Sequence, residues 1–267
     1  WPFQIITVSG RNKAALDANT ARLAAHLRAN TDQPFADVAW TLRTGRRAFE
    51  KRRLVVARDH LDAAMLLEQS GSRRVHTHDA MSRPDIVFLF PGGGAQYVGM
   101  ARDLYETEPV FAEWIDRGLS HLETLDSRSI RDLWCPDPGN DAQATEALRQ
   151  PSLQLPLIMI VEYALAQLWM SWGIQPTAVA GHSMGENTAA CIAGVLSFDD
   201  CIGLVHLRGT LFDIVEKGGM LSVALPAEAL RPLLGDALEL GAVNSPVLSV
   251  ASGPSAALMR LEPSLSF

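Results

Sequence analysis

Residues 176–192 constrain the fold most, because they predict a strand, a tight turn and a helix in immediate succession. The short β-rich run TAVA enters GHSMG at Gly181–Gly185, and an apolar helical pattern begins after Ser183. A serine between two glycines at such a turn is held with its hydroxyl exposed. The new helix points backbone N–H groups and its positive end toward that hydroxyl, which favours a developing oxyanion. Ser183 is therefore the candidate nucleophile.

The same arrangement is predicted earlier in the chain. Asp85–Phe90 (DIVFLF) is a continuous apolar run, typical of a central parallel strand covered on both faces. The glycine-rich turn PGGGAQ follows at once, at Pro91–Gln96. Helices, including one over Pro151–Trp169, are predicted between the two strands. We therefore expect an α/β subdomain, hydrolase-like, with a mostly parallel sheet, over residues 84–212.

Residues 1–83 predict a smaller α/β unit ahead of this subdomain. The periodicity favours strands and helices in alternation, at Phe3–Ser9, Asn12–Ala29, Phe35–Arg43, Arg53–Ala57 and from Leu61 onward. Residues 213–267 predict a β-α-β-β-α series, with strands at 219–223, 238–244 and 247–251 and helices at 227–234 and 255–261. Because this series lacks a final strand, we expect a ferredoxin-like subdomain that is incomplete in this chain.

Composition narrows the class of protein. Hydrophobic residues make up 48% and charged residues 20%, the profile of a globular protein. The most apolar stretch, Leu155–Ile174, carries Glu162 and Gln167, so we expect a buried core helix rather than a membrane span. The chain shows no export signal, which predicts a cytoplasmic location. Cys135, Cys191 and Cys201 lack metal-type spacing and predict reduced thiols.

Charge is distributed unevenly along the chain. Residues 1–83 carry 14 Lys and Arg against 8 Asp and Glu, a net charge of +6, whereas residues 84–267 carry −13. A nucleic-acid binder usually has a basic main domain, and here the main domain is acidic, so nucleic acid is not expected as a partner. The basic segment predicts either a solvated face or a docking surface for an acidic neighbouring domain.

Arg208 is the only Lys or Arg in residues 150–216, and its helix also carries Leu204, Val205, Leu207 and Leu211. A guanidinium in apolar surroundings needs an anionic or polar partner, and its planar fork suits a carboxylate. The partner is either the carboxylate of a ligand or a structural one, such as Glu186 or Asp213.

Five stretches together resemble a known family: GHSMGE, FPGGGAQ, Gln150 within RQPSL, Arg208 within LVHLRG, and NSPVLSVASGP at 244–254. In this order they resemble the malonyl-CoA:acyl-carrier-protein transacylase family, and most closely the acyltransferase domains of type I modular polyketide synthases. Residues 1–83, with PFADVAWTLRTGRRAF, are similar to the linker that joins the ketosynthase to the acyltransferase in those synthases.

The resemblance implies a role for each matching residue. Ser183 would be acylated, and the backbone N–H groups of Met184 and Gly93 would bind the oxyanion. The family usually has glutamine at position 93, so a side chain is lost here, and Gln96 is a candidate to compensate. Arg208 would bind the free carboxylate of a malonyl-type extender. His182 and Gln150 would line the substrate pocket.

The mechanism lacks a general base in this chain. A serine nucleophile needs a base to take its proton and return it to the leaving thiol. His182 is a poor base because adjacent residues at a sharp turn project differently, and His206 is expected to serve in packing. The family's histidine would lie downstream of residue 267, so we expect this chain to be an incomplete enzyme.

The resemblance therefore implies ping-pong acyl transfer from coenzyme A to the phosphopantetheine thiol of an acyl carrier protein, without a bound metal or redox cofactor. The neighbouring ketosynthase domain of the same polypeptide is the second expected partner. A serine hydrolase or thioesterase is an alternative, although such enzymes place an acid and then a histidine after the serine. A non-catalytic docking fragment is the third hypothesis.

Overall fold

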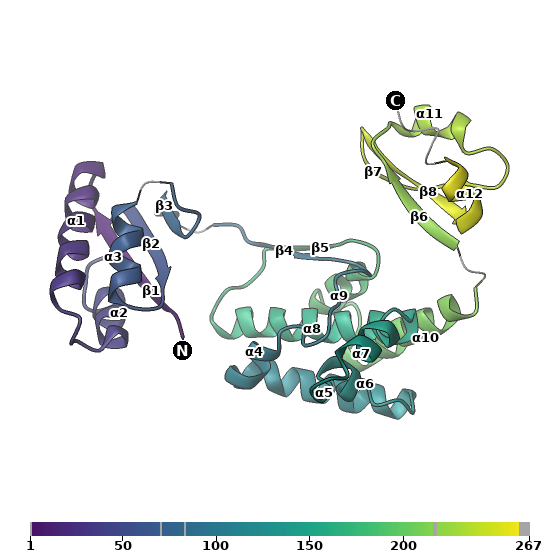
Figure 1. The fold of residues 1–267 in the computed structure, drawn as a ribbon, viewed down its shortest axis with the longest axis horizontal. Coiled ribbons are helices and arrows are strands. Elements are labelled where there is room, and N and C mark those ends of the chain that lie inside the picture. The colour runs from purple at the N-terminus through teal and green to yellow at the C-terminus, as the bar shows by residue number, and fades with distance from the viewer. Residues whose placement is uncertain (1, 70, 83, 216–217, 262–267) are drawn as a thin grey trace. The chain divides into compact units, whose positions relative to one another are not determined.

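The computed structural model describes residues 2–69, 71–82, 84–215 and 218–261. The predicted boundary at residue 83 and the last six residues of the predicted small subdomain lie outside these ranges. The chain divides into two compact units, Trp1–Pro84 and Asp85–Phe267 (Figure 1).

The first unit is a three-stranded antiparallel sheet of order β1-β2-β3 with three helices. Its core includes Ile6, Val55 and Leu27, all fully buried. Strand β3 (VHTHD) was not predicted from the sequence, because four of its five residues are exposed and it shows no apolar alternation. The elements are β1 (Gln4–Gly10), α1 (Lys13–Ala29), α2 (Phe35–Thr44), β2 (Lys51–Ala57), α3 (His60–Glu68) and β3 (Val75–Asp79).

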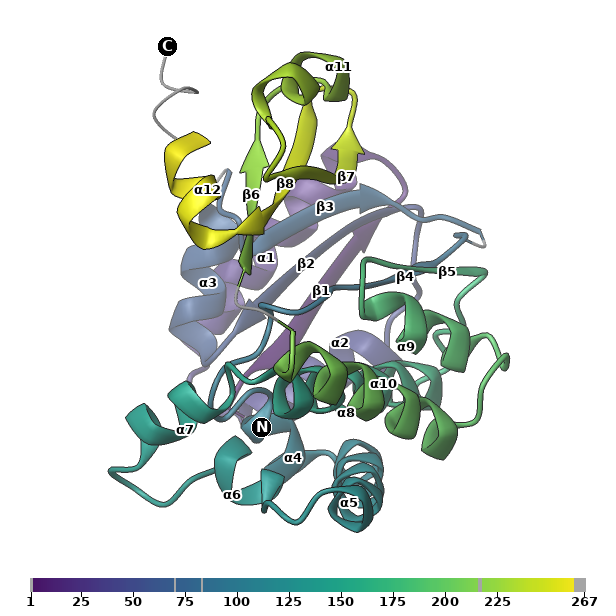
Figure 2. The same cartoon turned by 90° about the vertical axis from the view of Figure 1, so that its right-hand side faces the viewer.

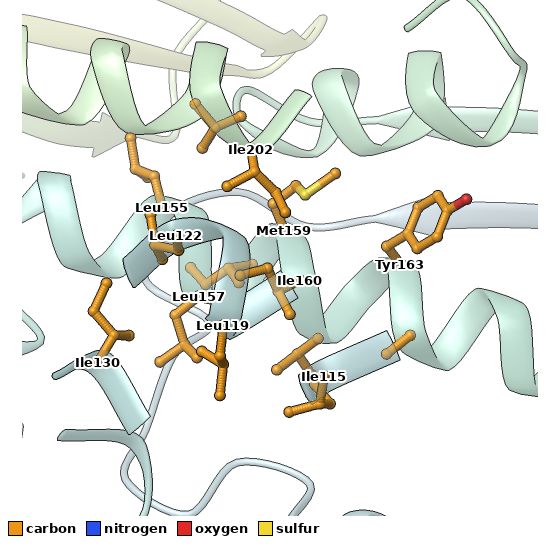
Figure 3. Close-up of a cluster of buried hydrophobic side chains, with 14 of the residues drawn as sticks. Ile115, Leu119, Leu122, Ile130, Leu155, Leu157, Met159, Ile160, Tyr163 and Ile202 are labelled. Atoms are coloured by element: carbon orange, nitrogen blue, oxygen red, sulfur yellow. The ribbon is translucent and has the colours of Figure 1, made fainter. Parts of the chain in front are cut away.

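The largest part of the second unit is a helical body built around α8 (Pro151–Ser171). This helix is long and apolar enough to cross a membrane by length and composition, but most of it is buried against other helices. Figure 3 shows the core, in which Ile115 and Leu119 of α5 meet Leu157 and Ile160 of α8. The surrounding helices are α4 (Arg102–Thr107), α5 (Pro109–Leu125), α6 (Ile130–Trp134), α7 (Asp141–Ala147), α9 (Gly185–Ile192) and α10 (Phe198–Asp213).

Two parallel strands, β4 (Val87–Phe90) and β5 (Ala178–Gly181), pair directly. Helices α8 and α9 cover one face of the pair, where Phe90 packs with Ala166 and Ala189 (Figure 2). The prediction that β4 is covered on both faces is wrong for the described residues, because Val87 and Leu89 are 51% and 75% exposed. Within the described part of the second unit this face of β4 is left open, and an apolar run in the sequence does not reveal which faces of a strand are covered.

The last part of the unit is a three-stranded antiparallel sheet of order β6-β8-β7 with helices packed on it. Its small core includes Leu230, Ala251 and Leu258. The observed β-α-β-β-α order is the predicted series, and the helix predicted at 227–234 splits into two short helices because Pro232 interrupts it. The elements are β6 (Gly218–Val223), α11 (Ala227–Leu230), η1 (Arg231–Leu233), β7 (Glu239–Ser245), β8 (Leu248–Pro254) and α12 (Ser255–Leu261).

Candidate active site

Ser183 lies on the tight turn that joins β5 to α9. Pairing of Phe90 with Gly181 continues one residue further, where the backbone N–H of His182 donates to the carbonyl oxygen of Phe90 at 2.9 Å. Ser183 then adopts φ 55°, a left-handed conformation that residues other than glycine rarely take. Its side chain is exposed. A strained, exposed serine at the end of a parallel strand is the geometry of a nucleophile turn.

Two glycines make this turn possible. A Cβ atom on Gly181 would lie 2.2 Å from the carbonyl carbon of Gly185, and one on Gly185 would lie 2.2 Å from the carbonyl oxygen of Phe90. Both distances are far shorter than any van der Waals contact. Glycine is therefore required at positions 181 and 185, because a side chain at either would prevent the close approach of β4, β5 and α9.

The glycine-rich turn after β4 passes beside the serine. A Cβ atom on Gly92 would lie 3.1 Å from the Cβ atom of Ser183, so the two turns touch. Within the described residues, the backbone N–H groups of Gly93 and Met184 donate no hydrogen bond to the protein. These are the two groups that the sequence assigned to the oxyanion, and both remain available to a ligand.

Gln96 stabilises the glycine-rich turn. Its Oε1 accepts a hydrogen bond from the backbone N–H of Gly94 at 2.9 Å. The amide oxygen is thus used inside the turn, and a substrate contact through Gln96 stays a prediction.

Gln150 lies at the N-terminus of α8, within a polar network. Its Oε1 accepts a hydrogen bond from Nη1 of Arg128 at 2.8 Å, and Nη2 of Arg128 donates to Oγ of Ser152 at 3.0 Å. Arg128 also pairs with the Asp126 carboxylate, and this guanidinium lowers the pKa of Asp126 to about 2. The side chain of Gln150 is therefore oriented by Arg128, and its predicted substrate contact stays a prediction.

His206 joins this network from α10. Its Nδ1 lies 3.3 Å from the carbonyl oxygen of Ser152, and its Nε2 lies 3.9 Å from Oδ2 of Asp126. Its side chain is 15% exposed, so His206 fastens α10 to the first turn of α8. Gly209 permits the close approach, because a Cβ atom there would lie 2.4 Å from the carbonyl oxygen of Pro151.

Arg208 is half-buried on α10. Its apolar surroundings are more open than the sequence predicted, since Leu204, Leu207 and Leu211 are 40%, 56% and 51% exposed. The alternative structural partners, Glu186 and Asp213, do not form an ion pair with Arg208 in the part of the chain that the structure describes. Its guanidinium is thus available for an anionic ligand.

The hydroxyl group of Ser183 has no general base as a hydrogen-bond partner in the described part of the second unit. Oγ of Ser183 makes no hydrogen bond to any of the described residues. His182 is exposed and next to Ser183 in sequence, and His206, the only later histidine, is engaged with Ser152 and Asp126. No histidine of the second unit, as far as the structure describes it, hydrogen-bonds to Oγ of Ser183.

The sequence analysis assigned no role to two polar side chains of α8. Glu162 of α8 is buried, and its Oε2 accepts a hydrogen bond from Oγ1 of Thr188 on α9 at 2.6 Å. Burial raises the pKa of Glu162 to about 7. Gln154 of α8 is half-buried beside Gly93. Its spacing of four residues from Gln150 was the available signal, because such residues share a helix face.

Comparison with known proteins identifies the family. Residues 87–266 match the family described as acyl transferase domain, and residues 4–67 match the one described as CurL-like, PKS C-terminal. The chain belongs to the acyl transferase domain family. The predicted resemblance is confirmed, and so is acyltransferase as the class of enzyme, whereas the serine hydrolase and docking-fragment alternatives are not favoured.

The relatives are polyketide synthases and their acyl transferase domains. The chain is 36% identical over 261 residues to erythronolide synthase EryA2 of Saccharopolyspora erythraea, covering 94% of the chain and 7% of that protein. It is 38% identical to mycoketide-CoA synthase of Mycobacterium tuberculosis, covering 95% of the chain and 6% of that protein. The chain thus spans less than a tenth of the length of these relatives.

Solved structures confirm the predicted fold class. The acyl transferase domain of ZmaA superposes with a TM-score of 0.90 at 36% identity, covering 99% of the chain and 62% of that structure. The acyl transferase domain of SpnD, solved in complex with 2-(pent-4-yn-1-yl)malonyl, gives a TM-score of 0.82 at 34% identity, with 99% and 62% covered.

Proposed function

We propose that this acyl transferase domain loads a malonyl-type extender unit from coenzyme A onto Ser183. It then passes the unit to the phosphopantetheine thiol of an acyl carrier protein, in polyketide or complex-lipid synthesis. The observation that carries the proposal is the exposed, left-handed Ser183 beside two backbone N–H groups that have no acceptor among the described residues. The malonyl-type ligand of the SpnD relative supports the class of substrate.

The reaction proceeds in two balanced half-reactions. Oγ of Ser183 attacks the thioester carbon, its proton goes to a base, and the coenzyme A thiol leaves with that proton. The carrier thiol then attacks the acyl-serine ester, gives up its proton, and Ser183 recovers its hydroxyl. In both half-reactions the N–H groups of Gly93 and Met184 donate to the tetrahedral oxyanion, and Arg208 holds the extender carboxylate.

The base belongs to the proposal as well. We infer that a histidine outside the described residues takes the proton of Ser183, because no described histidine of the second unit hydrogen-bonds to its Oγ and His206 is engaged with Ser152 and Asp126. The domain organisation is also proposed: residues 1–83 form the linker from a ketosynthase, 84–212 the large subdomain and 213–267 a ferredoxin-like small subdomain. The match of residues 4–67 to a polyketide synthase segment supports the first assignment.

The proposed function also implies partners and a cellular location. The proposed partners are the acyl carrier protein and a ketosynthase domain, in the cytoplasm. A groove of about 1000 Å³ in the first unit is lined by several basic side chains and one acidic residue, Asp37, which supports docking of an acidic neighbour. The basic lining consists of Arg22, His26, Arg43, Arg46, Arg47, Arg52 and Arg53.

Intact-mass measurement tests the proposal. The full natural polypeptide that carries this chain, mixed with malonyl-CoA, should gain one malonyl group, and Ser183→Ala should remove it. Ser197→Ala is the matched control, since Ser197 is a serine that caps α10 away from the turn. An adduct that persists in Ser183→Ala and maps to another residue would show that the nucleophile is wrongly assigned.

A further inference from the structure

The side chain of Gln154 lies next to the space that glycine leaves empty at position 93. A Cβ atom on Gly93 would lie 3.3 Å from Cδ2 of Leu155 and 3.4 Å from Oε1 of Gln154. A side chain at position 93 would therefore project toward the first turn of α8. The amide of Gln154 thus lies at van der Waals distance from the point where that side chain would begin.

The Gln154 amide has no hydrogen-bond partner among the residues that the structure describes. Its backbone N–H donates to the carbonyl oxygen of Gln150 at 2.9 Å as part of the helix. Across the described ranges, its side-chain oxygen and nitrogen make no hydrogen bond, whereas the amides of Gln96 and Gln150 are both engaged. A half-buried amide without a protein partner has its hydrogen-bonding capacity free for a ligand.

The glycine-rich turn connects this amide to the nucleophile. A Cβ atom on Gly92 would lie 3.1 Å from Cβ of Ser183, and one on the next residue, Gly93, would lie 3.4 Å from Oε1 of Gln154. Two consecutive glycines thus lie next to the reacting serine and next to the Gln154 amide. The N–H of Gly93, which donates to no described residue, lies in the same turn.

We propose that Gln154 replaces the side chain missing at position 93 and donates its amide N–H to the acyl oxygen as it becomes an oxyanion. This inference rests on the proposed function, because it assumes that the acyl group is carried by Ser183. Gln154 would be a third donor beside the backbone N–H groups of Gly93 and Met184.

Kinetics of acyl-enzyme formation in the full natural polypeptide test this role. Gln154→Met keeps the length of the side chain and removes its amide, so loading should slow about 10- to 100-fold, the effect of losing one donor to a charged oxygen. The loss should lie in the rate at saturation rather than in KM, and should be equal for malonyl-CoA and acetyl-CoA, because both form the same oxyanion. Gln167→Ala, which removes an amide further along α8, should leave loading unchanged.

A reciprocal exchange tests whether the two positions share one space. Gly93→Gln alone should slow loading, because its side chain would crowd Leu155 and Gln154 at contacts of 3.3–3.4 Å. In a Gln154→Ala background the same change should restore loading to within a few-fold of the original rate. Thermal unfolding of each variant, measured in parallel, shows that the fold is kept.

Three results would overturn the inference. They are unchanged loading in Gln154→Met, a loss confined to malonyl-CoA, and losses that simply add in the double variant. Each of them leaves the proposed function standing as long as Ser183→Ala still abolishes the adduct. Conversely, an adduct that survives Ser183→Ala removes the proposed function whatever the Gln154 variants show.

Discussion

Replacing Glu162 by glutamine should make the protein more stable at alkaline pH. The carboxyl group is buried between α8 and α9, Oγ1 of Thr188 donates to its Oε2, and its Oε1 has no hydrogen-bond partner among the described residues. Burial raises the pKa of Glu162 from 4.5 to about 7, because the ionised form loses its hydration, and the hydrogen bond from Thr188 offsets only part of this effect.

The sign of the pH dependence follows from this raised pKa. Below pH 4.5 the carboxyl is protonated in both the folded and the unfolded protein, so burial carries no ionisation cost. Between pH 4.5 and about 7 only the unfolded state ionises, and the free energy of unfolding falls as pH rises. At about 1.4 kcal/mol per pKa unit, the loss reaches about 3 kcal/mol above pH 7.

Glutamine keeps an acceptor for Thr188 and cannot ionise. Its amide nitrogen would occupy the unpartnered position of Oε1, which costs part of the gain. We therefore expect Glu162→Gln to unfold with a free energy about 1–3 kcal/mol higher than the original protein at pH 8, and with little difference at pH 5. Urea denaturation at pH 5, 6, 7 and 8, followed by tryptophan fluorescence, measures this difference.

Glu113→Gln on α5 is the matched control, because Glu113 is exposed and the substitution removes the same charge. It should leave the pH dependence of stability as it is in the original protein. Equal slopes for all three proteins between pH 5 and 8, or a Glu162→Gln variant that is less stable at pH 8, would refute the assignment of a raised pKa to Glu162.

Two further substitutions test the site. Arg208→Ala should slow malonyl loading roughly 30-fold or more, because truncating one partner of a desolvated charge pair costs about 2–5 kcal/mol. Acetyl loading, measured alongside, should stay nearly constant, and equal losses for the two substrates would show that Arg208 has a structural role. Gly185→Ala should lower the thermal unfolding midpoint and abolish acylation together, because its Cβ would lie 2.2 Å from the carbonyl oxygen of Phe90. Gly203→Ala on α10, where a Cβ atom meets nothing within 4 Å, is its control.

The turn at Ser183 could be predicted from sequence because its chemistry is local. Gly181 and Gly185 are dictated by contacts with neighbouring backbone, and the strand and helix on either side follow from short-range periodicity. The order of elements after residue 217 was predictable for the same reason. Strand β3 was not, because its pairing with β2 is made by backbone groups and leaves four of its five side chains exposed.

Features that depend on contacts between distant segments could not be predicted. Glu162 and Thr188 are 26 residues apart and Arg128 and Gln150 are 22 apart, and no periodicity marks either pair. Leu204, Leu207 and Leu211 suggested a covered helix face, yet they are exposed, because the pattern shows that a face is apolar and not what lies against it. The same holds for Val87 and Leu89 of β4.

The two parts of the site differ in how they tolerate sequence change. An oxyanion hole made of backbone N–H groups persists whatever side chain its residues carry, provided that the turn keeps its path, so glycine at position 93 is compatible with acyl transfer. A contact made by a side chain is lost when that side chain changes. The side-chain amide missing at position 93 can be replaced only by another residue that reaches the same space. Gln154 lies at that space, on the turn of α8 that also contacts α10 through Gly209. Because α10 carries Arg208, a shift of this turn would disturb the proposed oxyanion contact and the proposed carboxylate contact together. The packing of α8 is therefore expected to limit sequence change at the site more than any single ligand-binding residue does.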